Sequence, residues 1–183
     1  MTEGSLSSDL IIRTATFNDI PLIQDIVAKT WPVAYTDILG EKQVSYMIDL
    51  FYSASSLLQQ MNNQHCFLVA FNESNHIGFA SFSHKNECIY KLEKLYVLPT
   101  DQKTGAGKAL LQTVEKEALS MGAAKLRLNV NRKNIAKTFY QKNGFKVIAE
   151  EDIDIGNGYF MNDYIMEKDL PVPERSIRLF LNN

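Results

Sequence analysis

The sequence predicts a single α/β domain, of the α+β type, in which helices flank a mixed, mostly antiparallel sheet of about seven strands. Three observations favour this class. The 183 residues are enough for one well-buried core, and no long Pro-, Gly- or Ser-rich linker divides them. Apolar residues recur at helical spacing in some segments and alternate with polar residues in others. Polar turns separate the alternating segments, as in a meander and a hairpin.

The first part of the chain is predicted to form a strand followed by helices. Leu10 to Thr14 is a short, β-branched run suited to an opening strand. Thr16 and Asp19 have the spacing of a capping box, and apolar residues then recur at helical spacing from Ile20 to Trp31. The first helix is therefore expected to start near Ile20. Two further helical segments are expected at 41–52 and 55–61.

The remainder of the chain alternates between strands and helices. Strands are predicted at 66–71, 77–83, 88–98, 125–130, 145–155 and 159–170, and helices at 107–120 and about 134–142. The first three of these strands follow one another as a meander, and the Gly156-Asn157-Gly158 turn makes the last two a hairpin. The domain is expected to span 10–170, between a disordered tail at 1–9 and a C-terminal tail at 171–183.

Composition excludes several classes of function. The net charge of −2 supplies no overall field for holding a nucleic acid. No basic and apolar leader opens the sequence and no apolar run is long enough for a membrane span, so we expect a cytoplasmic protein with no membrane partner. Cys66 and Cys88 lie in apolar, strand-like stretches and are expected to be reduced core thiols.

One segment is typical of an anion-binding site. A strand ends before Pro99, a polar loop contains Gln102, and Gly105-Ala106-Gly107 opens a helix. Unpaired amides and the helix dipole favour a phosphate at such a helix start. The segment is not a P-loop, because Gln102 and Ala109 occupy the positions that require Gly and Ser or Thr, and Leu110 breaks the dinucleotide fingerprint. The alternative is that the glycines form only a tight turn between strand and helix.

Two motifs in this order resemble a known enzyme superfamily. Gln102-x-x-Gly105-x-Gly107 is similar to the Q/R-x-x-G-x-G/A signature of the GCN5-related N-acetyltransferases (GNAT). The segment NIAKTFYQKNGF, from Asn134 to Phe145, is similar to the N-x-A-x-x-F-Y-x-x-x-G-F block that follows it in that superfamily. The resemblance covers roughly Ile11 to Leu170, and the segments TWPVAY and IGNGYFMNDYIMEKDL further resemble the polyamine (spermidine/spermine) acetyltransferase-like branch.

The resemblance implies the GNAT fold, with the sheet splayed between its fourth and fifth strands, and an N-acetyltransferase that uses acetyl-CoA as cosubstrate. The pantetheine arm is expected to lie along Leu95, Tyr96 and Val97, with a backbone N–H near Val97 directed at the thioester oxygen. Asn134 would hydrogen-bond the pantetheine. The pyrophosphate is expected over Gln102, Lys103, Thr104, Gly105, Ala106, Gly107 and Lys108.

Tyr140 and Glu93 are the candidate catalytic residues. A phenol with a pKa of about 10 is protonated at neutral pH and can give its proton to the departing thiolate, so Tyr140 is the expected general acid; the alternative is a core aromatic. Glu93 is the candidate general base, because on a regular strand it shares a face with Lys91, Leu95 and Val97. The position that matches the base of the histone-modifying members is Lys91, so Glu93 could instead be a substrate-binding acid or a solvated strand charge.

The acceptor is expected to be a small cationic amine such as a polyamine, acetylated by direct attack in a ternary complex. Trp31, Tyr35 and Glu93 would bind it, together with acids of the closing hairpin, Glu150, Glu151, Asp152 and Asp154. The alternatives are a hydrophobic anchor at Trp31 and a solvated acidic edge. The three histidines lack ligand spacing, so no metal is expected. A protein N-terminal or lysine acetyltransferase, a non-catalytic acyl-CoA-binding module, and a homodimer all remain open.

Overall fold

The computed structural model describes residues 10–73 and 75–171. Seven strands within them are β1 (Leu10–Thr14), β2 (Cys66–Asn72), β3 (Asn75–Asn86), β4 (Ile89–Val97), β5 (Lys125–Asn131), β6 (Lys146–Gly156) and β7 (Tyr159–Asp169). The α-helices are α1 (Ile20–Leu39), α2 (Glu41–Tyr52), α3 (Ala54–Asn62), α4 (Ala106–Ser120) and α5 (Ala136–Lys142). The predicted tail at 1–9, and residues 172–183 of the tail predicted at 171–183, lie outside the described residues.

The strands form one mixed sheet in the order β1-β2-β3-β4-β5-β7-β6. All neighbouring strands are antiparallel except β4 and β5, which are parallel. This confirms the predicted fold class: a mostly antiparallel sheet with flanking helices. Because the chain passes from β4 through α4 to β5, the parallel pair has the helical crossover that such a connection requires.

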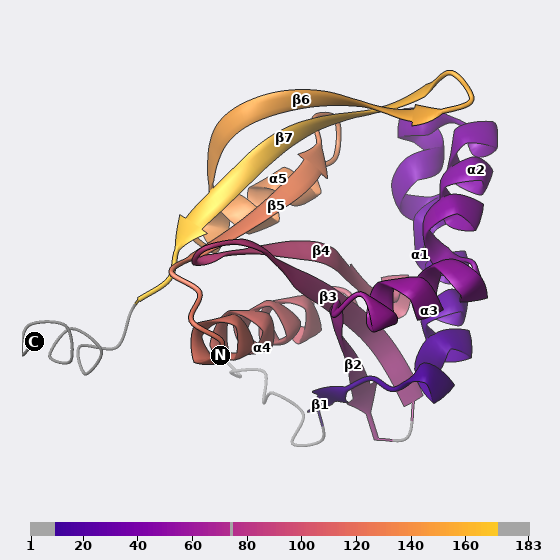
Figure 1. Ribbon diagram of the computed structural model, residues 1–183. Helices are drawn as coiled ribbons and strands as arrows, with labels where there is room; N and C mark the ends of the chain where they lie inside the picture. Colours follow the sequence, from indigo (N-terminus) through magenta and orange to yellow (C-terminus); the bar gives the residue numbers. More distant parts are fainter. Residues whose placement is uncertain (1–9, 74, 172–183) are drawn as a thin grey trace, which may run out of the picture.

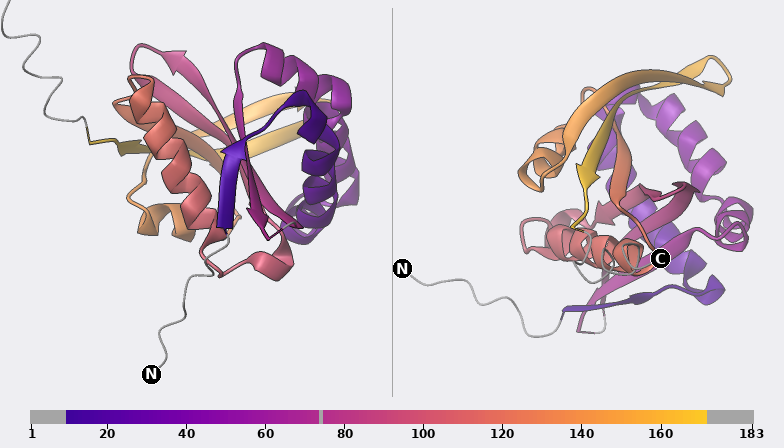
Figure 2. Two further views of the ribbon diagram at one scale, coloured as in Figure 1. Left: turned by 90° about the horizontal axis from the view of Figure 1, so that it is seen from below. Right: turned by 60° about the vertical axis from the view of Figure 1, so that its left-hand side comes forward.

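Helices cover both faces of the sheet (Figures 1 and 2). On one face, α4 and the α5 residue Tyr140 join a core cluster with Leu92, Leu128 and Met166 of the strands. On the other face, α1, α2 and α3 form a second cluster with Phe67, Val69 and Phe79. The left view of Figure 2 shows α4 on one side of the strands and the three N-terminal helices on the other. Among the described residues, no helix is long and apolar enough to cross a membrane.

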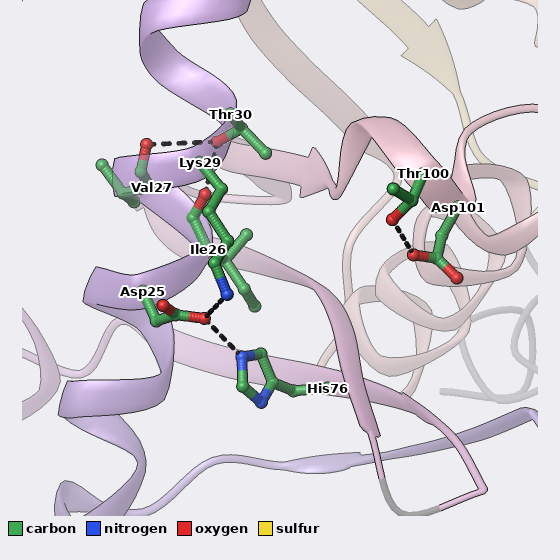
Figure 3. A network of polar contacts seen from close by, with 8 residues as sticks. All are labelled: Asp25, Ile26, Val27, Lys29, Thr30, His76, Thr100 and Asp101. Carbon is green, nitrogen blue, oxygen red and sulfur yellow. Dashed lines mark hydrogen bonds and ion pairs between the residues drawn. The ribbon is translucent and has the colours of Figure 1, made fainter.

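Helix α1 extends beyond the segment in which apolar residues recur at helical spacing, which ends at Trp31. The helix continues past Pro32 to Leu39. The proline removes one backbone donor, yet packing of α1 against the second cluster maintains the helix. An ion-pair network fixes α1 to β3 (Figure 3): the Asp25 carboxylate accepts from Lys29 Nζ and His76 Nε2, each at 2.7 Å. This attachment joins the first half of α1 to the start of β3.

The hairpin of β6 and β7 reaches over to α2, as Figure 1 shows. Tyr46 Oη donates to the Ile155 carbonyl at 2.7 Å, and Gln43 Nε2 donates to the Phe160 carbonyl at 2.8 Å. The rings of Tyr46 and Tyr159 lie 5.2 Å apart. These contacts join the hairpin tip to the helical layer.

The cysteines differ from their predicted setting. Cys66 begins β2 and packs at the edge of the first cluster, whereas Cys88 lies in the turn between β3 and β4. Both thiols are free and only partly buried. The prediction of free thiols is confirmed, and the prediction that both are core residues is wrong because the strand begins one residue after Cys88.

The predicted capping residue Asp19 gives a first testable expectation. Its carboxylate accepts from Arg13 at 2.8 and 2.9 Å and from the Thr16 N–H at 2.7 Å, and the Arg13 hydrogen bonds lower its pKa to about 2 despite partial burial. Because the folded-state pKa lies below the unfolded value, this stabilisation is present above about pH 4 and is lost as the pH falls toward about 2. Asp19→Asn should lower the free energy of unfolding by about 1 to 2 kcal/mol at neutral pH, after allowance for screening of the half-exposed Arg13.

Urea unfolding at neutral and acidic pH measures this effect. Asp37→Asn, on the exposed side of α1, is the matched control and should leave the unfolding free energy unchanged. An equal loss in Asp19→Asn at neutral pH and near pH 2 would show that the carboxylate charge is not the cause.

Candidate active site

The sheet opens between β4 and β5. The two strands pair only at Ile89–Leu92 and Lys125–Leu128, although β4 continues to Val97 and β5 to Asn131. The unpaired ends diverge, as the splay predicted by resemblance requires. A cavity of about 890 Å³ lies at this opening.

The cavity is lined by side chains from both faces of the sheet. Leu95, Val97 and Tyr140 belong to the cluster that contains α4, whereas Trp31 and Tyr96 belong to the cluster of the N-terminal helices. The cavity therefore passes through the sheet at the place where β4 and β5 are no longer hydrogen-bonded to each other. One end can receive a ligand from the α4 side and the other end a ligand from the α1 side.

The N-terminus of α4 borders the first end of the cavity. Gly105 adopts φ of 93°, a left-handed conformation that glycine adopts without strain, and turns the loop into the helix. The first amides of α4 have no partner within the helix, so they are free to bind an anion. Gln102, Lys103, Gly105, Gly107 and Lys108 line the cavity. Thr104 and Ala106 do not: the Thr104 hydroxyl donates to the Asp101 carbonyl at 2.6 Å, and Ala106 is buried.

The end of β4 offers a backbone donor to the opening. The Leu98 N–H donates to the Ile77 carbonyl of the β3 segment at 2.8 Å. Amides alternate in direction along an antiparallel strand, so the Val97 N–H points away from β3 and toward the gap left by β5. Leu95 and Val97 present apolar side chains to the same end of the cavity, whereas the Tyr96 ring lies on the opposite side of the sheet.

Tyr140 and Asn134 also line the cavity, on the side of α5. Asn134 Oδ1 accepts the Ala136 N–H at 2.8 Å, which caps α5 and leaves the side-chain amide nitrogen as a donor. Tyr140 is 8% exposed and packs its ring 5.3 Å from Phe139 and 5.8 Å from Phe145. Burial raises the pKa of Tyr140 above its ordinary value, so the phenol keeps its proton throughout the physiological range.

Aromatic rings form the second end of the cavity. Trp31 lies 4.6 Å from Tyr35, 5.2 Å from Tyr52 and 5.9 Å from Tyr96 between ring centroids. The hydroxyls of Tyr35 and Tyr96 are 3.4 Å apart. Burial raises the pKa of each of these tyrosines. The predicted substrate residues Trp31 and Tyr35 thus lie together and border one space.

Glu93 lines the cavity at a β-bulge. The β3–β4 register shifts between Ser81 and Phe82, so Glu93 has no partner on β3. Its carboxylate accepts from Ser83 at 2.8 Å and pairs with Lys85 and Lys91. The prediction that Glu93 shares a face with Leu95 and Val97 is wrong, because the bulge turns Glu93 toward Lys91 and away from the α4 side.

The partners of Glu93 determine its protonation. Burial raises its pKa, but the combined effect of Lys91, Lys85 and Ser83 is larger and lowers the pKa to about 2. A base with so low a pKa takes a proton from an alkylammonium only at high energetic cost. Lys94 also lines this end: its Nζ donates to Gln60 Oε1 at 2.6 Å, and burial lowers its pKa to about 8.

The predicted acidic run on β6 lies elsewhere. Glu150, Glu151, Asp152 and Asp154 are exposed and are absent from the cavity lining. Arg132 pairs with Glu150 and Asp152, and Asp154 accepts the Gly156 N–H within its own turn. The prediction that these acids face the acceptor is wrong, because they lie on the edge strand of the sheet.

A different acid, Asp163 of β7, lines the cavity and was missed by the sequence analysis. It is 6% exposed and lies opposite Asn131 of β5 in the ladder. Asn129 lines the cavity on the same face, and its buried Nδ2 has no hydrogen-bond partner among residues 10–73 and 75–171. The period-two pattern of β7 is the signal that could have found Asp163, because the residue lies between the inward-facing Met161 and Ile165.

The histidines are separate from this cavity. His76 belongs to the α1–β3 network in Figure 3, and His84 Nε2 donates to the Glu87 carbonyl in the β3–β4 turn. Among the described residues, no group of three or more His, Cys, Asp or Glu side chains could hold a metal ion. The absence of a metal from the reaction remains a prediction.

Comparisons with known proteins agree with this geometry. The family model described as "Acetyltransferase (GNAT) domain" matches residues 36–167. An uncharacterised N-acetyltransferase of Mycobacterium tuberculosis is 29% identical over 147 residues, which are 79% of this chain and 94% of that protein. The PaiA N-acetyltransferase of Thermoplasma acidophilum, solved with coenzyme A, is 31% identical with a TM-score of 0.75, over 88% of this chain and 99% of that one.

A more distant structure shares the fold. The ribosomal-protein-S18-alanine N-acetyltransferase of Escherichia coli is 19% identical, with a TM-score of 0.68 over 90% of this chain and 96% of that one.

Proposed function

The chain belongs to the GNAT acetyltransferase family and is an acetyl-CoA-dependent N-acetyltransferase; from this premise we propose that its acceptor is a small cationic amine such as a polyamine. The observation that carries the proposal is the second end of the cavity, where Trp31 and Tyr35 lie beside the carboxylates of Glu93 and Asp163. Aromatic faces and carboxylates together attract an organic cation.

The cofactor end fits the chemistry of coenzyme A. An open helix N-terminus with Lys103 and Lys108 suits a pyrophosphate, and the apolar wall of Leu95 and Val97 suits the pantetheine arm. The free side-chain amide of Asn134 supplies a donor to that arm. In the proposed arrangement, the Val97 N–H points at the thioester oxygen and stabilises the negative charge that develops there.

In the proposed reaction, the amine nitrogen of the acceptor attacks the thioester carbon directly within a ternary complex. The C–N bond forms as the C–S bond breaks, and Tyr140 gives its proton to the departing thiolate. Glu93 is proposed as an acid that helps to hold the cationic acceptor, since its pKa of about 2 does not suit a general base.

The position of the hairpin supports a small acceptor. Tyr46 and Gln43 of α2 bond to the hairpin backbone at Ile155 and Phe160, and Phe160 also lines the cavity, so the hairpin borders the acceptor end and takes up room that a protein segment would need. Lys94 opposes cations at this end. Burial lowers its pKa to about 8, so this repulsion weakens as the pH rises above about 8, and its Nζ donates to Gln60.

An acceptor panel tests the proposal. With acetyl-CoA saturating, we expect spermidine to give a higher kcat/KM than an uncharged aromatic amine or peptides that begin with alanine. Added salt should raise the KM for spermidine, because ions screen the attraction between the amine and the acids. A clearly higher kcat/KM for a peptide would contradict the polyamine proposal and would indicate that the acceptor is a protein N-terminus or lysine.

Two further features are proposed from the sequence alone. The protein is proposed to be cytoplasmic, where acetyl-CoA is available, and to form a homodimer. Size-exclusion chromatography with light scattering measures the oligomeric state.

A further inference from the structure

We infer that Asp163 is a catalytic residue of this site: its carboxylate binds the ammonium group of the acceptor and accepts the proton that the nitrogen must lose before it attacks. The inference deepens the proposed function, since it names the group that activates the amine. It applies to any amine acceptor that enters the cavity from the α1 side.

Asp163 occupies a distinctive place in the cavity. The residue is 6% exposed and lines the cavity from β7, opposite the diverging end of β5. Within the described part of the chain, no Lys or Arg nitrogen lies within 4 Å of its carboxylate. A buried carboxylate without a cationic partner is energetically costly, so a cation supplied by the ligand would relieve that cost.

Neighbouring side chains point to the same ligand. Asn129 Nδ2 is buried beside the cavity and lies close enough to Asp163 to lower the pKa of that carboxyl, so the two side chains form one polar site for the acceptor or an ordered water. Asp163, Tyr35 and Tyr140 all line this cavity, so an acid, an aromatic ring and a proton donor border one space.

The surroundings of Asp163 also favour proton acceptance more than those of Glu93 do. Burial raises the pKa of Asp163, and Glu151 acts in the same direction, while Asn129, Lys91 and Arg132 act against them. These groups face Asp163 from β4, β5, β6 and the segment after β5, and Tyr35 faces it from α1. By contrast, Lys85 and Lys91 pair directly with Glu93 and lower its pKa.

The proton balance of the step is simple. The acceptor R–NH3+ gives one proton to the Asp163 carboxylate, and the freed electron pair forms the C–N bond to the acetyl carbon. The thiolate that leaves takes a proton from Tyr140. Once the C–N bond has formed, the nitrogen loses its second proton, and this proton restores the Tyr140 phenol. Asp163 then releases the first proton to solvent, so each turnover releases one proton, one free thiol and one amide.

The pH dependence of Asp163→Asn tests this role. At about pH 7 we expect kcat/KM to fall about 10²-fold or more, because the variant must use the rare neutral amine, whose conjugate acid has a pKa of about 10.4. The ratio of wild-type to variant activity should shrink steadily from about pH 7 to about pH 9, as the neutral amine becomes more abundant. Asp163→Glu, which keeps a carboxylate, should recover part of the loss.

Asp169→Asn is the matched control, because Asp169 lies on the same strand as Asp163 but its side chain is 86% exposed and it is outside the cavity lining. It should retain the wild-type rate. Stabilisation by acetyl-CoA in thermal unfolding should persist in Asp163→Asn, which establishes that the variant is folded with an intact cofactor end.

The assay uses spermidine and an alanine-initiated peptide in parallel, so that the acceptor and Asp163 are tested separately. Preference for the peptide overturns the polyamine proposal, while the pH comparison on that peptide still tests Asp163. The inference is overturned if Asp163→Asn keeps the wild-type rate, or if its deficit is the same at every pH with either acceptor, since a merely structural residue would give that uniform loss.

Discussion

Replacing Tyr140 with phenylalanine should lower kcat by about 10²- to 10⁴-fold and leave acetyl-CoA binding nearly unchanged. The ring that packs against Phe139 and Phe145 is kept, and only the hydroxyl is removed. Because the proton is needed as the thiolate departs, the loss should appear in kcat rather than in KM. Steady-state rates of thiol release, together with a single-turnover measurement, locate the loss in the chemical step.

Tyr164→Phe is the matched control for this change. Tyr164 is also near the first core cluster, but it lies outside the cavity lining. Its hydroxyl can therefore be removed without loss of rate. If Tyr140→Phe turns over as fast as the wild type while chemistry limits the rate, water and not Tyr140 protonates the thiolate.

Replacing Gly107 with glutamate should abolish the stabilisation of the protein by acetyl-CoA. A Cβ at this position would lie 3.7 Å from Val97 and 3.9 Å from both Leu95 and Phe139, which are ordinary contact distances at the cofactor end of the cavity. Alanine should therefore fit, whereas a longer, negatively charged side chain would occupy the groove and repel the pyrophosphate. A ligand at 100 times its Kd raises the free energy of unfolding by about 2.7 kcal/mol, so the lost shift is measurable.

Thermal unfolding with and without acetyl-CoA measures this loss for three proteins. Gly107→Ala is the control and should keep most of the shift seen in the wild type. The melting temperature of Gly107→Glu without ligand establishes whether the variant is folded. A folded Gly107→Glu protein that is stabilised as strongly as the wild type would place the pyrophosphate elsewhere.

Much of the fold could be predicted from the sequence, because its signals are local. The capping residues Thr16 and Asp19, the alternating strands and the Gly156–Gly158 turn each determine a neighbouring element. The end of helix α1 was harder to predict, because a proline such as Pro32 usually interrupts a helix. Here the packing of α1 against the second cluster maintains the helix beyond Pro32. The local structure of the predicted cofactor end could be predicted for a similar reason, because the loop, Gly105 and the start of α4 are consecutive in the chain; that these residues bind the cofactor remains a prediction.

The acceptor end was predicted less well, because it is assembled from residues distant in sequence. One β-bulge at Glu93 changes the face of that residue, and no local pattern indicates the bulge. The acidic run from Glu150 to Asp154 was conspicuous in sequence, but it lies on the exposed edge strand. Asp163 was inconspicuous, yet the pairing of β7 with β5 brings it to the cavity.

Transfer of a labelled acetyl group tests the central claim most directly. The wild-type protein is incubated with acetyl-CoA labelled in the acetyl group and with spermidine, and the label in the amine is compared with the free thiol released. We expect one labelled N-acetyl group for each thiol, and loss of both signals in parallel in Tyr140→Phe and Gly107→Glu. Release of thiol without label in any amine of the panel, or the absence of both signals from a protein that binds acetyl-CoA, would contradict an N-acetyltransferase with its active site in this cavity.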